Sequence, residues 1–241
     1  MKKTYYNKKD KNYMPIIEHF IELRERIFIS LLVFIITLTI SIIYSKQITF
    51  IIQQPALGIK FLQLAPGEYL FVSIKIGMYC ALLASSPFSL YQILLFILPG
   101  LTKKESRYII PLSIGSITLF FCGIIFAYKI LIPITLKFLI NYGSDIVEPI
   151  WSFEEYFNFI ILLLFSVGIS FQIPILQITL GITNIINTEK MLQSWKYVAF
   201  IATIIGAIIT PSTDPITQAL MTIIILLLYF SGILTLKMIQ K

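Results

Sequence analysis

Residues 27–44 read IFISLLVFIITLTISIIY, and this stretch decides the fold of the chain. It holds 18 residues without a charged side chain. An apolar run of about 18 residues or more is long enough to cross the hydrocarbon core of a bilayer as a helix. No small-residue cleavage site follows the run, so it indicates a retained transmembrane helix and not a secretory signal peptide.

Five further apolar segments lie at residues 70–98, 108–133, 156–182, 198–209 and 216–236. Pro87 and Pro174 predict bends within two of them, because proline removes a helical hydrogen bond. The segment 198–209 gives only roughly 18 Å of helix, which is shorter than a hydrocarbon core of about 30 Å. We predict an all-α, polytopic membrane protein with six transmembrane helices. It forms a single domain over residues 1–241, and residues 1–15 are a polar, basic tail without the features of a transit peptide.

The overall composition supports a membrane location and argues against several classes of enzyme. The mean hydropathy is +0.87 and only 13% of the residues are charged, whereas soluble domains carry about 25%. The single histidine, His19, cannot supply a pair of haem ligands, and no zinc-protease motif is present. Cys80 and Cys122 lie inside apolar runs without a partner at metal or disulfide spacing. We therefore expect no metal, no cofactor and no enzymatic activity.

The basic residues are distributed unevenly between the two sides of the predicted bundle. Fourteen lysines and arginines fall in segments on the side of the termini, against three to five on the other side. Because such residues accumulate on the cytoplasmic side of membranes, both termini are predicted to face the cytoplasmic or stromal side. The basic residues occur in short stretches between apolar runs and not on one face, so nucleic acid is not an expected partner.

Two segments on this inner side carry carboxylates. The sequence from Glu18 to Arg26 predicts an amphipathic helix in which Glu22 and Arg26 pair at helical spacing. In the loop after the second helix, Thr102 and Glu105 fit a capping box for the third helix. A second interpretation is that Glu22 and Glu105 together bind two guanidinium groups, since each carboxylate accepts a forked arginine contact. Sequence spacing alone leaves both interpretations open.

These segments resemble the signature motifs of the TatC family, the membrane receptor subunit of twin-arginine protein translocases. The similar stretches run from about Glu18 to the sixth helix and occur in the family's order. They are His19-Phe-Ile-Glu-Leu-Arg-Glu-Arg26, Ser86-Pro87 with Tyr91-Gln92, Phe96-Ile-Leu-Pro-Gly-Leu101 with Glu105, Gly168-Ile-Ser-Phe-Gln-Ile-Pro174, and Thr210-Pro211 with Asp214.

The resemblance implies a receptor for twin-arginine signal peptides of folded precursors, which are transported with the energy of the proton gradient. It implies signal-peptide binding by Glu22, Glu105, Arg24, His19, Phe96, Pro99 and Leu101. Pro55 and Asp214 match further family positions. The implied partners are the signal peptides, single-span subunits similar to TatA and TatB, and further copies of the chain within the lipid bilayer.

One position departs from the commonest pattern of the family. Many members carry glutamate where this chain has Gln172 in the fourth helix, and an amide there cannot hold a proton or a charge. Gln172 is either a polar contact to a partner within the membrane or an amide that packs between helices. The stretch Thr210–Gln218 and Gln172 look like the cyanobacterial and plastid branch. We therefore expect a plastid thylakoid membrane, with a bacterial plasma membrane as the alternative.

Two other functions fit the sequence less well. A small-solute transporter usually places charges or broken helices at mid-membrane, whereas the acidic residues here lie at predicted helix ends or in loops. A membrane-bound enzyme requires a nucleophile with a base or a metal cluster, and the sequence contains neither.

Overall fold

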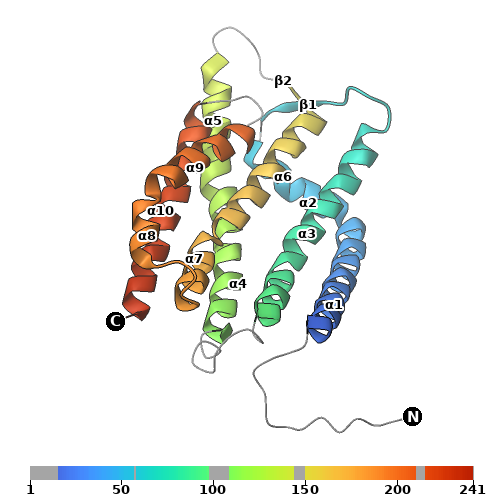
Figure 1. Ribbon diagram of the computed structural model, residues 1–241. Coiled ribbons are helices and arrows are strands. Elements are labelled where there is room, and N and C mark those ends of the chain that lie inside the picture. The colour runs from blue at the N-terminus through green and yellow to red at the C-terminus, as the bar shows by residue number, and fades with distance from the viewer. Residues whose placement is uncertain (1–15, 57, 98–108, 144–149, 210–214, 241) are drawn as a thin grey trace, which may run out of the picture.

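The computed structural model describes residues 16–56, 58–97, 109–143, 150–209 and 215–240. Long helices run alongside one another, and short helices and a two-stranded ribbon join them (Figure 1). In chain order the elements are α1 (Ile16–Ile43), α2 (Ser45–Gln53), η1 (Gln54–Ala56), β1 (Lys60–Leu62), α3 (Glu68–Ile97), α4 (Ile109–Phe126), η4 (Ala127–Leu131), α5 (Ile132–Gly143), β2 (Ile150–Ser152), α6 (Phe153–Ser170), α7 (Ile173–Ile182), α8 (Thr188–Gln193), α9 (Trp195–Ile209) and α10 (Pro215–Ile239). The start of α1 and the end of α10 lie at one end of the bundle, which we call the inner end (Figure 1).

Within the described residues, all six apolar segments predicted from the sequence are mainly helical, which confirms the all-α membrane fold. Five of the helical spans are long and apolar enough to cross a membrane, namely 17–43, 68–93, 110–142, 153–182 and 215–239. The remaining span is α9, the segment that the sequence predicts to be short. It has 15 residues. At about 1.5 Å per residue it extends for roughly 22 Å, so the bilayer beside α9 has to thin or polar groups at its ends have to reach the interface.

The boundaries of the helices differ from the predicted ones in two places. The third span does not end near residue 133: α4 continues through η4, a π-helical stretch, into α5. The fourth span divides at Phe171 and Gln172, between α6 and α7. Pro174 lies just after this break, in the first turn of α7, where its missing N–H removes no helical hydrogen bond. By contrast, α3 continues past Pro87 to its end.

The core of the bundle is built around α6. In the most apolar part of the span formed by α6 and α7, 61% of the residues are buried, against 6% for α1. Phe157, Ile160, Leu163 and Val167 of α6 are almost completely buried. A helix that is apolar on all sides is expected either in the core or in contact with lipid. Here α6 forms the core, and α1 exposes most of its apolar surface.

At the outer end, one buried carboxylate joins the start of α3 to the start of α6. Glu68 Oε2 accepts hydrogen bonds from the backbone N–H groups of Leu64 and Ala65, at 2.6 and 3.1 Å. Its Oε1 accepts one from the backbone N–H of Glu154, at 3.0 Å. Beside this contact β1 and β2 form a parallel pair, which the sequence analysis does not predict. The ribbon and Glu68 together fix the outer ends of the two helices.

Replacing Glu68 with alanine is expected to destabilise the fold, because three backbone N–H groups lose a charged acceptor. The free energy of unfolding is expected to fall, because backbone N–H groups shielded from water are costly when they have no acceptor. The thermal unfolding midpoint of the purified protein in detergent measures this loss. Glu155, whose side chain is exposed in the first turn of α6, provides the matched control. An unchanged midpoint for Glu68→Ala, or an equal decrease for Glu155→Ala, contradicts the role given to Glu68.

Candidate functional site

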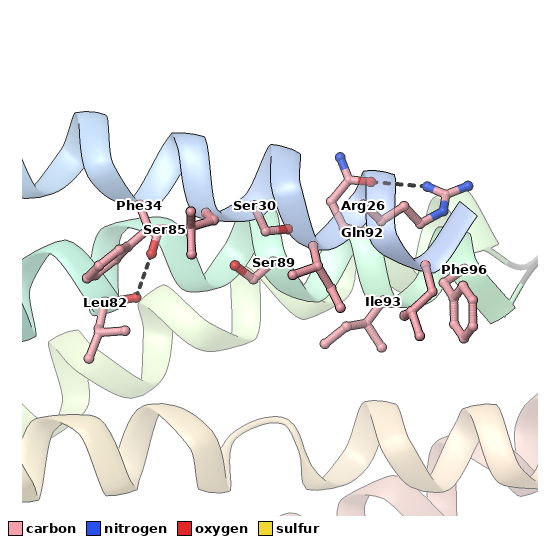
Figure 2. A pocket seen from close by; sticks show the side chains of 12 residues that line it. Arg26, Ser30, Phe34, Leu82, Ser85, Ser89, Gln92, Ile93 and Phe96 are labelled. Carbon is pink, nitrogen blue, oxygen red and sulfur yellow. Dashed lines mark hydrogen bonds between the residues drawn. The ribbon is translucent and has the colours of Figure 1, made fainter. Parts of the chain in front are cut away.

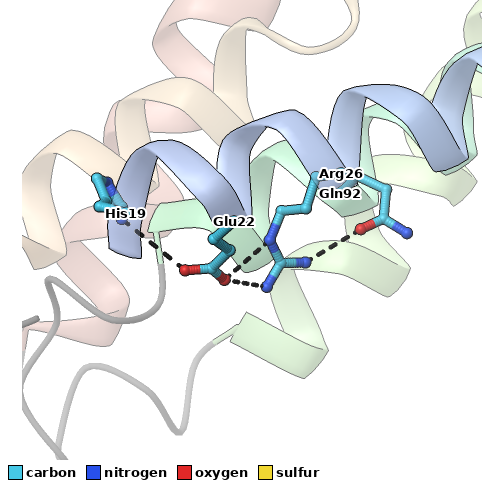
Figure 3. A network of polar contacts seen from close by, with 4 residues as sticks. All are labelled: His19, Glu22, Arg26 and Gln92. Carbon is cyan, nitrogen blue, oxygen red and sulfur yellow. Dashed lines mark hydrogen bonds and ion pairs between the residues drawn. The ribbon is translucent and has the colours of Figure 1, made fainter. Parts of the chain in front are cut away.

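The first turns of α1 place Glu22 and Arg26 on the same face of the helix, as their spacing predicts. Both Nε and Nη2 of Arg26 donate to Glu22 Oε1, at 3.0 and 2.5 Å (Figure 3). Arg26 Nη1 donates to Oε1 of Gln92 on α3, at 3.0 Å. The predicted pair is confirmed, and its link to α3 is a further finding. A carboxylate at the inner end of α1 therefore accepts a forked contact from a guanidinium group.

A second contact between α1 and α3 lies beside this network. The rings of His19 and Phe96 are stacked, with their centroids 4.2 Å apart and an angle of 15° between their planes. His19 Nδ1 is 3.8 Å from Glu22 Oε2 (Figure 3). Three of the predicted site residues, His19, Glu22 and Phe96, are thus brought together. Arg24 lies on an exposed part of α1 outside this network.

The two oxygens of Glu22 differ in their surroundings. Oε1 accepts both donors from Arg26, whereas Oε2 is enclosed by protein and has no hydrogen-bond donor among the residues that the structure describes. An enclosed carboxylate oxygen without a donor is costly, because it loses its contacts with water and gains no replacement. In this arrangement Oε2 of Glu22 therefore lacks a hydrogen bond and is also shielded from water.

An apolar groove continues from this network along the seam between α1 and α3. Its volume is about 340 Å³, and Figure 2 shows its side chains arranged along both helices. Arg26 and Gln92 belong to both the polar network and the lining of the groove, and Phe96, which stacks on His19, lines it as well. Ser30, Ser85 and Ser89 line it further along, among apolar side chains. The groove therefore joins a charged end to a mainly apolar surface.

The other predicted residues are not part of this cluster. Pro55 lies in η1, which follows the far end of α1 from Glu22, so it does not share a site with that carboxylate. The predicted positions outside the described residues are Glu105, Pro99, Leu101 and Asp214. Gln92 has a position in the cluster that the sequence analysis did not assign. Its only signal was its place in the second-helix motif, because no periodicity within α1 or α3 shows which residues face each other.

Gln172 is buried where the fourth span breaks, with 6% of its surface exposed. Its Oε1 accepts a hydrogen bond from Ser116 Oγ at 2.6 Å, and its Nε2 donates to the Ser116 backbone carbonyl at 3.1 Å. Ser116 belongs to α4, so this pair of hydrogen bonds joins α4 to the break between α6 and α7. The arrangement is that of an amide that packs between helices.

Comparison with known proteins supports one family. The family model described as Sec-independent protein translocase protein (TatC) matches residues 18–223. The chain is 64% identical to a tatC-like protein, ycf43, of Gracilaria tenuistipitata var. liui, over 95% of this chain and 96% of that protein. It is 48% identical to the Sec-independent protein translocase protein TatC of Synechocystis sp., over 95% and 90%. It is 45% identical to the chloroplastic TATC of Pisum sativum, over 92% and 64%.

The fold matches a solved structure of the same family. A crystal structure of the twin-arginine translocase receptor TatC superposes with a TM-score of 0.83 at 38% identity, over 90% of this chain and 98% of that one. The cyanobacterial and chloroplast relatives confirm the predicted branch, and the apolar helices confirm a multi-pass protein of a plastid thylakoid or bacterial membrane. With the family model covering residues 18–223 and relatives that match along nearly its whole length, this chain belongs to the TatC family of Sec-independent protein translocase proteins.

Proposed function

We propose that this chain is the receptor subunit of a twin-arginine translocase and binds the signal peptides of folded precursors at its inner end. The family and the similar crystal structure support this proposal. The observation that carries it is the forked contact between Arg26 and Glu22, which supports the proposal that this carboxylate accepts a guanidinium group. Glu105 is proposed as the second carboxylate, since a pair of arginines presents two forks.

The shape of the site fits the chemistry of a signal peptide. Such a peptide carries a positively charged segment followed by an apolar segment of about 7–15 residues. The cluster at Glu22 offers a carboxylate, and the adjoining groove between α1 and α3 offers an apolar surface. Arginine suits this carboxylate better than lysine, because its planar fork presents two N–H groups at once. We infer that the charged segment binds at Glu22 and that the apolar segment lies along the groove.

The remaining parts of the proposal concern partners and mechanism. The short helix α9 exposes Phe200, Ile204 and Ile208, and much of α1 is exposed as well. This apolar surface is available for single-span subunits similar to TatA and TatB, for another copy of this chain, or for lipid. Transport is proposed to use the proton gradient and to involve no covalent chemistry. The role of this chain is therefore recognition and assembly and not catalysis.

Replacing Glu22 with glutamine is expected to weaken binding of a twin-arginine signal peptide about tenfold or more, because a charge-assisted hydrogen bond contributes roughly 1.5–3 kcal/mol. The measurement is the fluorescence anisotropy of a labelled signal peptide titrated with the full chain in detergent. Glu25→Gln is the matched control, since Glu25 is an exposed carboxylate on the same helix.

The same titration includes Glu105→Gln and a peptide with lysines in place of its arginines. Both changes are expected to weaken binding. Glu22→Gln is expected to lower the affinity for the lysine peptide by a smaller factor than the affinity for the arginine peptide. Equal affinities of Glu22→Gln and the unaltered protein for the arginine peptide would falsify the receptor site proposed here.

Filling the groove is expected to weaken binding without altering the carboxylate. Ser89→Phe places a ring in the lining of the groove and is expected to lower affinity about tenfold, since one apolar side chain of the peptide, worth roughly 1.5 kcal/mol, loses its place. Ala84→Phe adds the same ring on an exposed part of α3 and serves as the control. If both variants bind the peptide with the unaltered affinity, the apolar segment lies elsewhere.

A further inference from the structure

Arg26 already makes the contact that the proposed function assigns to an arginine of the signal peptide. Its guanidinium donates twice to Glu22 Oε1 and once to Gln92, so three of its five N–H groups have an acceptor in this network. The Glu22 carboxylate of the free protein is therefore occupied by a guanidinium group from the same helix (Figure 3).

We propose that Arg26 is an internal competitor for Glu22 and sets the affinity of this site for arginine ligands. The inference rests on the proposed function, because it assumes that the ligand binds through Glu22. In the free protein Arg26 holds the carboxylate, and the signal peptide binds by taking its place. In the free protein, the Arg26 guanidinium thus occupies the position that an arginine of the signal peptide takes in the complex.

The ligand must replace Arg26 because the carboxylate has no room for a second fork. Oε1 already accepts two N–H donors, and Oε2 is enclosed by protein beside His19. A bidentate arginine contact uses both oxygens from one direction, and a second guanidinium beside Arg26 also meets repulsion between like charges. An incoming arginine therefore gains Glu22 only when Arg26 leaves it.

Arg26 is well placed to leave. The pair is part-buried, with 21% of the Arg26 side chain and 20% of the Glu22 side chain exposed, so it keeps contact with the inner surface and is weaker than a fully enclosed ion pair. The hydrogen bond from Nη1 to Gln92 uses a different part of the guanidinium from the contact with Glu22, so it can persist after release. The site then opens by a change of one side chain, without movement of α1 or α3.

This arrangement makes a specific thermodynamic prediction. When only a fraction of the protein has an open site, the apparent affinity of every ligand that needs the site falls by that same fraction. Removing the competitor therefore strengthens the binding of arginine and lysine peptides by an equal factor, and the ratio between the two affinities stays constant. Arg26 lowers the affinity for both peptides by the same factor, and Glu22 provides the preference for arginine.

The experiment titrates the full chain, in detergent, with a labelled twin-arginine signal peptide and with its twin-lysine form. Arg26→Gln is expected to bind both peptides about threefold to tenfold more tightly, in line with the strength of a partly exposed ion pair. Arg26→Lys keeps the charge but loses the fork, and it is expected to show a smaller gain for both peptides. Lys237→Gln removes one exposed cation from the inner end of α10 and is expected to leave both affinities unchanged.

Three results would overturn the inference. Weaker or equal binding by Arg26→Gln would mean that Arg26 orients Glu22 or has no role. Tighter binding by Arg26→Gln, with no change for Arg26→Lys, would mean that the loss of a positive charge causes the effect and not the release of the Glu22 carboxylate. A changed ratio between the two peptides would mean that they use different sites. The receptor role fails separately, when the unaltered protein does not bind the arginine peptide or when Glu22→Gln binds it equally well. The thermal unfolding midpoint of each variant shows that it is folded.

Discussion

The packing of α1 against α3 is the interaction on which the candidate site depends. Helix α1 is the least buried of the long helices, and α3 is its main packing partner. Near the outer end Gly77 lets Ile42 approach closely, since a Cβ atom at Gly77 would lie 3.0 Å from Ile42 Cγ1. Near the middle Thr37 Oγ1 donates to the Ala81 carbonyl at 3.3 Å. At the inner end the two helices are held by polar and aromatic contacts, and the groove lies in this part of the seam.

This change along the seam explains how one helix pair can be both a scaffold and the proposed binding surface. Close backbone approach through small residues holds membrane helices together, because lipid supplies no hydrophobic force between them. Where the packing opens into the groove, the helices remain aligned through the stacked rings of His19 and Phe96 and the contact between Arg26 and Gln92. These contacts also keep Glu22 from moving freely. The helices around the candidate site are therefore positioned before any ligand arrives, so binding is expected to require the displacement of Arg26 and no rearrangement of α1 or α3.

The sequence predicts the parts of this structure that depend on local composition. Apolar runs locate all six membrane spans, and helical spacing predicts the pair of Glu22 and Arg26. The break at Gln172 was not predicted, because Pro174 suggests a bend in general but does not show which residue leaves the helix. The contacts of Gln172 with Ser116, of Gln92 with Arg26, and of Glu68 with Glu154 join residues far apart in the chain, and no period within one helix encodes them. Family motifs indicated which inner residues to consider but not that Arg26 occupies Glu22.

The central claim is that the arginines of a precursor's signal peptide bind at the inner end of α1. The most direct measurement is site-specific photo-crosslinking from a photoreactive residue placed beside the arginine pair, followed by mapping of the adduct on this chain. The prediction is adducts on the segment from His19 to Arg26 of α1, whose yield falls when the arginines of the precursor are replaced by lysines. Adducts confined to α9, α10 or the outer ribbon, with none on α1, would contradict it.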